Sequence, residues 1–335
     1  MSEIGQFGLI DLLAGMVEKT RNECDKSWSC LLHGIGDDCA VWRPESLPVL
    51  GKVDCQVQNV HFQLDIIGWA DLGWKALAVN LSDIAAMGGA PRYALVSLGL
   101  PLTSAVEDVQ ALYRGLLELA SQTGTAVVGG NVSGSGVVFI DVNVIGVTGN
   151  PAGRYLTRAT ARPGDDIAVT GWLGSAAAGL RILKQKLALP QASAGVLKEA
   201  FARPHPRLKE GRLLVEKGVF CAMDISDGLV ADLGHICRAS GVSASLNAEK
   251  LPILPEVRQA FGDAALEMAL SGGEDYQLLF TGPPSVIADV IRASDYPVNI
   301  IGQIKSGPAG QVRVSDQSGR DYTPVQTGWD HFRSK

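Results

Sequence analysis

The chain repeats the same kinds of element in its two halves, on either side of one dense turn cluster. Apolar runs of strand length alternate with longer segments of helical pattern both before and after Gly149-Asn150-Pro151-Ala152-Gly153. Because glycine, proline and asparagine favour turns, we place a domain boundary there, between residues 1–152 and residues 153–335. Repeated strand and helix segments in both halves predict a two-domain protein of the α/β (α+β) class.

The hydrophobic pattern also gives approximate bounds for these elements. Helices are predicted at residues 6–19, 70–87 and 107–123, and strands from residue 49 and at 137–147, 166–170, 219–223, 276–280 and 298–304. A short apolar run at 126–128 is expected to stop at Gly129. The loop 171–175 precedes a small-residue helix and is expected to leave backbone amides free for an anion.

Two of these elements carry charged side chains beside apolar ones. In the strand from residue 49, Lys52 and Asp54 fall on one face and Val53 on the other. In the helix 70–87, Asp83 lies on or beside the apolar stripe. A carboxylate among apolar neighbours is costly unless it is paired or binds a metal, so Asp83 is the acid that most needs a functional explanation.

Composition excludes several classes of protein. The formal net charge of −6, with no basic tract, argues against a nucleic-acid partner. The first residues show neither a basic n-region nor an apolar span, so we expect a cytoplasmic protein without a membrane partner. The six cysteines form no CxxC pair and are expected to be packed free thiols, not a disulfide framework or a zinc site.

Acidic residues recur where apolar strands or glycine turns end: Asp37-Asp38, Asp54, Asp83, Asp224 with Asp227, and Glu274-Asp275. Carboxylates gathered in this way suit Mg²⁺, which joins them to substrate phosphates, and they favour phosphoryl transfer. The usual phosphate loops are missing, since GxxxxGK[ST] is absent and residues 34–39 lack the last glycine of GxGxxG. Metal ions between carboxylates and phosphate would explain the pattern. Solvated turn acids remain the alternative that spacing alone leaves open.

Several motifs together resemble one enzyme family. They are Gly34-Ile35-Gly36-Asp37-Asp38-Cys39-Ala40-Val41, the helix segment 75–88 with Asn80-Leu81-Ser82-Asp83, the loops 224–229 and 271–276, and the terminal Gly328-Trp329-Asp330-His331-Phe332. In these segments, which span nearly the whole chain, the sequence resembles the thiamine-monophosphate kinases of the AIR-synthase-like superfamily.

The resemblance implies a fold, a reaction and a partner. The fold would be two AIR-synthase-like domains, with a homodimer formed through the sheet of the amino-terminal domain. The reaction would be direct transfer of the γ-phosphoryl group of ATP to thiamine monophosphate, with Mg²⁺. The metal ligands carried over by motif are Asp38, Asp54, Asp83, Asp224 and Asp227, of which Asp54, Asp83 and Asp227 would be catalytic, and Asp37 lies beside them.

The same resemblance implies ligand contacts. ATP would contact Tyr113, Gly130, Asn131, Arg154 and Ser226, and thiamine monophosphate would contact His61, Glu274 and Trp329. An indole face suits a cationic thiazolium. On residue type alone, a lone histidine is more often structural, a near-terminal tryptophan more often packs, and a solvated arginine at a domain junction is common.

The sequence departs from the family pattern near the proposed metals. Lys52 and Val53 stand where the family usually has two hydroxyl residues, Asn59 replaces a glycine, and Asn131 replaces an aspartate that is a metal ligand. Asn131 removes a negative charge and Lys52 adds a positive one, and both changes weaken cation binding. Lys52 either pairs with a phosphate directly or neutralises Asp54.

Three functions are therefore weighed. The preferred one is an ATP- and Mg²⁺-dependent kinase for thiamine monophosphate. The second is a divergent, weakly active or non-catalytic paralogue that binds a nucleotide or a thiamine-like ligand. The third is another chemistry of the superfamily, that of an AIR synthase, a selenophosphate synthetase or a hydrogenase-maturation dehydratase. For the last two, the cysteines lie in the wrong places, because none follows Cys237 and neither Cys24 nor Cys30 lies in a glycine-rich segment.

Overall fold

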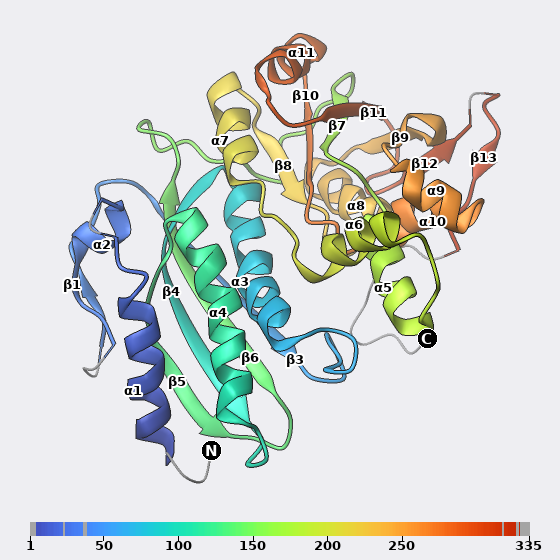
Figure 1. Ribbon diagram of the computed structural model, residues 1–335. Coiled ribbons are helices and arrows are strands. Elements are labelled where there is room, and N and C mark those ends of the chain that lie inside the picture. Colours follow the sequence, from blue (N-terminus) through green and yellow to red (C-terminus); the bar gives the residue numbers. More distant parts are fainter. Residues whose placement is uncertain (1–4, 23, 36–38, 317, 326–327, 329–335) are drawn as a thin grey trace. The chain divides into compact units, whose positions relative to one another are not determined.

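The computed structural model describes residues 5–22, 24–35, 39–316, 318–325 and 328. The chain forms two compact units (Figure 1). The N-terminal unit comprises residues 1–84 and 90–148, and the C-terminal unit comprises residues 85–89 and 149–335. Within the described residues, no helix combines the length and apolar character needed to cross a bilayer. All six cysteines are free thiols, but the expectation that they are packed is wrong for Cys24 and Cys39, which are exposed.

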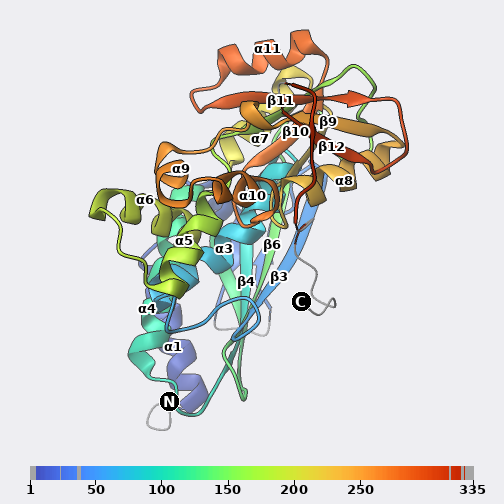
Figure 2. The same cartoon turned by 90° about the vertical axis from the view of Figure 1, so that its right-hand side faces the viewer.

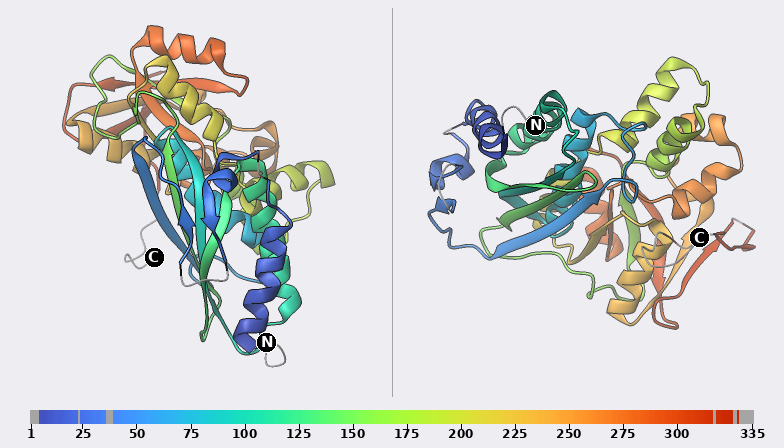
Figure 3. Two further views of the ribbon diagram at one scale, coloured as in Figure 1. Left: turned by 90° about the vertical axis from the view of Figure 1, so that its left-hand side faces the viewer. Right: turned by 90° about the horizontal axis from the view of Figure 1, so that it is seen from below.

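The N-terminal unit is built on a four-stranded mixed sheet with the order β3-β6-β4-β5. Its strands are β3 (Val49–Val57), β6 (Phe139–Thr148), β4 (Gly89–Leu100) and β5 (Ala126–Gly134). Strands β3 and β6 pair antiparallel, whereas β4 and β5 pair parallel. Three helices lie together on one side of this sheet (Figures 1 and 3): α1 (Gly5–Glu18), α3 (Trp69–Ala86) and α4 (Val106–Thr123).

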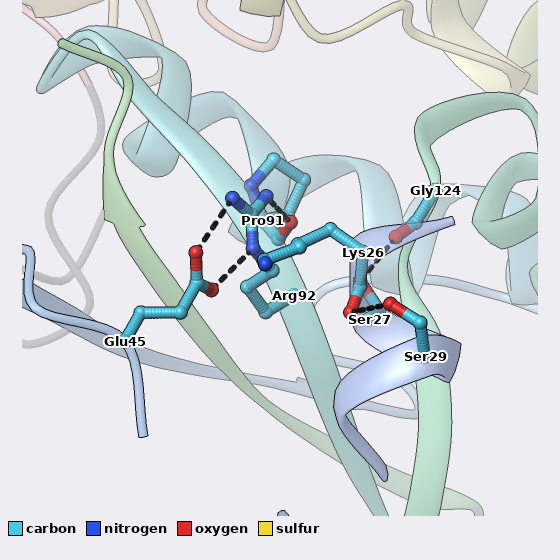
Figure 4. Close-up of polar contacts among 7 residues, drawn as sticks. All are labelled: Lys26, Ser27, Ser29, Glu45, Pro91, Arg92 and Gly124. Carbon is cyan, nitrogen blue, oxygen red and sulfur yellow. Dashed lines mark hydrogen bonds and ion pairs between the residues drawn. The ribbon is translucent and has the colours of Figure 1, made fainter. Parts of the chain in front are cut away.

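A short N-terminal segment is tied to this core by polar contacts (Figure 4). It contains helix α2 (Lys26–Cys30) and the paired strands β1 (Leu31–His33) and β2 (Val41–Trp42). The Ser27 hydroxyl donates to the carbonyl of Gly124, just after α4. Arg92 on β4 donates from Nε and Nη2 to the two carboxylate oxygens of Glu45, at 2.7 and 3.3 Å. This bidentate, largely buried pair fixes the segment that leads into β3.

The C-terminal unit contains a seven-stranded sheet with the order β13-β12-β9-β11-β7-β10-β8. Its strands are β7 (Asp166–Thr170), β8 (Cys221–Asp224), β9 (Ser243–Asn247), β10 (Leu278–Gly282), β11 (Val298–Lys305), β12 (Val312–Ser315) and β13 (Asp321–Tyr322). Neighbouring strands pair antiparallel except β12 and β9, which pair parallel.

Helices cover this second sheet. They are α5 (Ser175–Gln185), α6 (Gln191–Ala202), α7 (Leu208–Lys217), α8 (Leu229–Ser240), α9 (Pro255–Phe261), α10 (Ala264–Ser271) and α11 (Pro284–Ala293), with the 3₁₀ turn η1 (Ala248–Lys250). Figure 2 shows α7 and α11 on one side of the sheet and α8 and α10 on the other. The core between α8 and the sheet includes Leu233, Ile236 and Leu246, all almost fully buried.

The structure corrects two sequence expectations. The apolar run at 126–128 was expected to stop at Gly129, but β5 continues through Gly130 and Asn131 to Gly134. Glycine is needed at position 130 because a Cβ there would lie 1.9 Å from the Val96 carbonyl oxygen on β4. Strand β4 itself was not predicted. Most of its residues are buried, so it lacks the alternation that marks a half-exposed strand.

Helices α3 and α4 approach each other so closely that their backbones touch. A Cβ on Gly73 of α3 would lie 1.8 Å from the Leu112 carbonyl oxygen, and one on Gly115 of α4 would lie 1.7 Å from the Ala70 carbonyl oxygen. The two glycines therefore form reciprocal contacts. This packing holds α3, which carries Asp83, at a fixed place in the N-terminal unit.

We predict that Gly115→Ala destabilises the chain by on the order of 3 kcal/mol, because the methyl group must push α3 and α4 apart. Urea unfolding measures this change in the free energy of unfolding. The control is Gly15→Ala in α1, where a Cβ meets nothing within 4 Å. Helix propensity should make that variant equally stable or slightly more stable. Equal effects of the two substitutions would contradict the close-packing explanation.

Candidate functional site

In the N-terminal unit, strand β3 and helix α3 bring three charged side chains together. Lys52 and Asp54 lie on the same face of β3, as the alternating pattern predicted. The Lys52 ammonium lies 3.1 Å from Asp54 Oδ2 and 3.0 Å from Asp83 Oδ2. One cation thus bridges two carboxylates that are 29 residues apart in the sequence.

The environment of Lys52 favours its charged form. Burial alone would lower its pKa, but the carboxylates of Asp83 and Asp54 outweigh that effect and raise the pKa above the usual lysine value. Lys52 is therefore a permanent cation at neutral pH. The two carboxylates remain partly accessible, with side-chain exposures of 46% for Asp54 and 26% for Asp83.

A further acid, Asp141, was missed by the sequence reasoning. It lies on β6 opposite Cys55 in the β3–β6 register. Its Oδ1 is buried and has no hydrogen-bond partner among the described residues. Burial, and then the negative charge of Asp54, raise the pKa of Asp141. The available signal was an aspartate on the same strand face as Asn143, in a strand whose buried face is apolar.

Gly130, Asn131 and Tyr113 were expected to contact a nucleotide. Asn131 lies in β5 opposite Ser97 of β4, and its side chain is exposed. Tyr113 lies in α4 and is only 5% exposed, and burial strongly raises the pKa of its phenol. Tyr113 is therefore neutral and almost completely buried.

His61 is held by the turn that follows β3. Its Nδ1 accepts a hydrogen bond of 2.9 Å from the backbone N–H of Val57, so in the neutral ring the hydrogen is on Nε2. Asn59 in the same turn has φ of 66°. The family glycine at this position is thus explained by a left-handed backbone, which asparagine also tolerates. The Asn59 departure preserves the turn that orients His61.

In the C-terminal unit, a loop between β8 and α8 carries three of the predicted residues. Asp224 ends β8 and is buried, and Ser226 and Asp227 follow it. Asp232, in the first turn of α8, accepts hydrogen bonds of 3.1 to 3.2 Å from the backbone amides of Ser226, Asp227 and Gly228. Burial, with Asp224 and Asp227 nearby, raises the pKa of Asp232 to about 8.

Asp232 was not singled out from the sequence. Its signal was an acid four residues after Gly228, in the first turn of the helix that follows an acidic loop.

The motifs at 224–229 and 271–276, distant in the sequence, lie against each other. The backbone N–H of Glu274 donates to the Ser226 carbonyl at 2.8 Å, and that of Tyr276 donates to Ile225. A Cβ at Gly273 would lie 2.7 Å from the Ser226 carbonyl oxygen, and Glu274 itself has φ of 58°. The structure therefore brings Ser226, Asp227 and Glu274 into one place.

The acid next to Glu274 has a structural role. Asp275 is buried and accepts hydrogen bonds from the backbone amides of Gly174, at 2.7 Å, and Ala176, at 3.3 Å. The expectation that amides of the 171–175 loop are free for an anion is therefore wrong for Gly174, since a carboxylate of the chain already binds it. The amides attract a carboxyl oxygen as expected, but that oxygen belongs to the chain itself.

A cavity of about 210 Å³ adjoins this carboxylate within the C-terminal unit. Its lining includes Trp172, Ser175, Arg203, Arg207 and Tyr296. The Arg207 guanidinium lies 3.9 Å from the centre of the Tyr296 ring and donates to Gln277 at 2.9 Å. Aromatic faces and guanidinium groups together suit a planar ligand with hydrogen-bond acceptors.

Other predicted residues are not joined to these groups. Asp37, Asp38 and Trp329 lie outside the described residues. Arg154 is exposed in the segment that follows β6. Among the described residues, no group of three or more His, Cys, Asp or Glu side chains is arranged to hold a metal ion.

Comparison with known proteins identifies the family. Residues 36–148 match the N-terminal domain of AIR synthase related proteins, and residues 162–315 match the C-terminal domain. The thiamine-monophosphate kinase of Aquifex aeolicus is 35% identical over 99% of both chains. The chain belongs to the thiamine-monophosphate kinase family.

Solved structures of this family share the fold. The thiamine-monophosphate kinase of Stenotrophomonas maltophilia K279a gives a TM-score of 0.81 at 35% identity, covering 90% of this chain and 95% of that one. The structure of AaThiL complexed with AMPPCP and TMP gives 0.76 at 35% identity, covering 99% and 98%. The α/β class, the two AIR-synthase-like domains and the family that the motifs predicted are thereby confirmed.

The raised pKa of Asp275 predicts how the stability of this member of the thiamine-monophosphate kinase family depends on pH. Burial raises its pKa to about 7 in the folded chain, above 3.8 for an ordinary aspartate. Between pH 3.8 and about pH 7 the folded chain therefore holds a proton on Asp275 that the unfolded chain has released. The contribution of Asp275 to stability is complete below pH 3.8 and is lost as the pH rises to about 7. We expect Asp275 to contribute a slope of about −1.4 kcal/mol per pH unit to the free energy of unfolding.

Urea unfolding across this pH range measures the slope. Asp275→Asn stays neutral, so it should remove that contribution from the curve of unfolding free energy against pH. Asp263→Asn, which changes an exposed acid before α10, is the matched control and should keep the wild-type slope. A wild-type slope in Asp275→Asn would contradict the assignment.

Proposed function

We propose that this chain is an ATP- and Mg²⁺-dependent kinase that phosphorylates thiamine monophosphate. A phosphate oxygen of thiamine monophosphate would form a bond to the γ-phosphorus of ATP while the bond from that phosphorus to the β,γ-bridging oxygen breaks. The products are thiamine diphosphate and ADP. Such a reaction needs positioning and charge neutralisation more than covalent catalysis.

The observation that carries the proposal is the contact between the 224–229 and 271–276 loops. Their backbones hold Ser226, Asp227 and Glu274 together. The chain is 35% identical to AaThiL over almost its full length, and the structure of AaThiL was determined with AMPPCP and TMP. We therefore assign Ser226, with Tyr113, Gly130, Asn131 and Arg154, to ATP, and Glu274, with His61 and Trp329, to thiamine monophosphate.

The residues of the C-terminal unit fit Mg²⁺. Asp224 and Asp227 provide hard oxygen donors three residues apart on a loop whose backbone Asp232 fixes. Bound Mg²⁺ would neutralise phosphate charge there. In the N-terminal unit, Asp38, Asp54 and Asp83 would be the corresponding ligands, but Asp54 and Asp83 already share the Lys52 ammonium. The C-terminal unit therefore offers two carboxylates of the right chemistry for Mg²⁺, whereas Asp54 and Asp83 already bind the Lys52 ammonium.

The test of function is a chromatographic assay for thiamine diphosphate with ATP, thiamine monophosphate and Mg²⁺. We expect product in proportion to enzyme, and a loss of at least about 100-fold in Asp227→Asn because a metal ligand is removed. Asp289→Asn, which changes an exposed acid of α11, is the control and should retain activity. Equal rates in the two variants would contradict the role of Asp227.

The Lys52 bridge favours one alternative, a paralogue that binds a nucleotide or a thiamine-like ligand without phosphoryl transfer. It leaves two proposed metal ligands already neutralised. Binding of ATP or thiamine monophosphate by calorimetry, with no thiamine diphosphate at any Mg²⁺ concentration, would support this alternative and overturn the kinase proposal.

We also propose that the chain forms a homodimer through the sheet of the N-terminal unit. On β3, Val49 and Val53 are 66% and 51% exposed. They lie on the face opposite to Lys52 and Asp54. Exposed valines on a sheet face suit burial against a second copy. A cytoplasmic location is proposed too, since six free cysteines suit a reducing compartment.

Sedimentation velocity tests the dimer. Val53→Asp would place a charge in the proposed interface, and we expect it to shift the protein from dimer to monomer at micromolar concentration. Leu102→Asp, at an exposed loop position before α4, is the control and should remain dimeric. A wild-type chain that sediments as a monomer would overturn the proposal.

A further inference from the structure

The Lys52 ammonium pairs with both Asp54 and Asp83 within the N-terminal unit. Its nitrogen lies 3.1 Å and 3.0 Å from one oxygen of each carboxylate, within the range of charge-assisted hydrogen bonds. The contact joins strand β3 to helix α3, so it also links two elements of the N-terminal unit. The ammonium thus lies between two carboxylates, in a position that a bridging metal ion could otherwise occupy.

A divalent ion and the ammonium would compete for the same place. Mg²⁺ binds carboxylate oxygens at about 2.0–2.1 Å, so an ion bound to both Oδ2 atoms would stand close to a fixed positive charge. Each carboxylate has a second oxygen, but an ion that bridged the two Oδ2 atoms would be repelled at close range by the ammonium.

The anchoring of the two carboxylates adds to this competition. Asp83 lies on α3, which is held against α4 by the Gly73 and Gly115 backbone contacts. Asp54 lies within the continuous β3–β6 ladder. Both carboxylates therefore start from rigid elements, and the space between them is set by the fold and already contains the ammonium.

We propose that Lys52 is a built-in cation that takes the place of a divalent metal ion between Asp54 and Asp83. The inference rests on the proposed function for its biochemical meaning, because it says that this kinase binds one divalent ion fewer than a chain with a small neutral residue at position 52. Lys52 is a positioning residue in this account. It holds two carboxylates in place at any Mg²⁺ concentration.

The experiment compares wild type, Lys52→Ser and Lys52→Arg by thermal unfolding with and without Mn²⁺, and by counting bound Mn²⁺ in equilibrium dialysis. Without divalent ions, Lys52→Ser leaves two carboxylates unbridged, and we expect its Tm to fall by about 3 °C or more. Adding Mn²⁺ should restore that loss, and Lys52→Ser should bind one Mn²⁺ more per chain than wild type. Lys52→Arg keeps the positive charge and should gain no Mn²⁺.

The same number of bound Mn²⁺ ions in wild type and Lys52→Ser, with the same response of Tm, would overturn the proposal. A second measurement serves if Lys52→Ser does not fold. In the wild-type background, Asp83→Asn should leave the Mn²⁺ count unchanged because no divalent ion is bound there. A lower count in Asp83→Asn would also overturn the proposal.

These readouts separate the inference from the kinase proposal. Neither the Mn²⁺ count nor Tm requires turnover, so a chain that makes no thiamine diphosphate can still show the extra Mn²⁺ in Lys52→Ser. Conversely, kinase activity together with equal Mn²⁺ counts in wild type and Lys52→Ser would support the proposed function and contradict the role of Lys52 as a built-in cation.

Discussion

Buried carboxylates that accept hydrogen bonds from backbone amides hold the loops of the C-terminal unit in place. Asp232 binds three consecutive amides of the loop after β8, and Asp275 binds the start of α5. Each replaces the water that the amides would otherwise need, and each is costly to leave unpartnered in a buried site. Because these two acids define the loop backbones, Ser226, Asp227 and Glu274 have fixed positions that bound ligands need not create.

Local elements could largely be predicted from the sequence, whereas most contacts between distant elements could not. Helices α1, α3 and α4 follow from periodicity and stop signals, and β3 follows from alternation. Strand β4 could not be found in this way, because a strand buried on both faces shows no alternation. The partnership of Lys52 with Asp54 follows from the period of a strand, whereas its contact with Asp83 depends on where α3 packs.

The site residues divide along the same line. Sequence motifs single out Asp224, Asp227 and Glu274, but not Asp232 and Asp275 as the acids that shape their loops. An acid that binds a ligand and an acid that accepts hydrogen bonds from backbone amides look alike in a sequence, since both kinds occur in or beside glycine-containing loops here. Burial does not separate the two kinds, because Asp224 is buried as well as Asp232 and Asp275. Hydrogen bonds from backbone amides to Asp232 and Asp275 identify the second kind, and those contacts require the folded structure.

The departures from the family pattern differ in their effect on backbone conformation and on charge. Asn59 keeps a left-handed turn that glycine would also form, so its change is small. Lys52 changes the electrostatics of a site, because it supplies a single charge on a tether where a bound ion would supply two charges and open coordination positions. A tethered ammonium needs no metal from solution, but it cannot share an open coordination position with a phosphate as a metal ion does. With the metal sites that we propose, phosphate binding through metal would therefore fall mainly to Asp224 and Asp227, in the loop whose backbone Asp232 fixes.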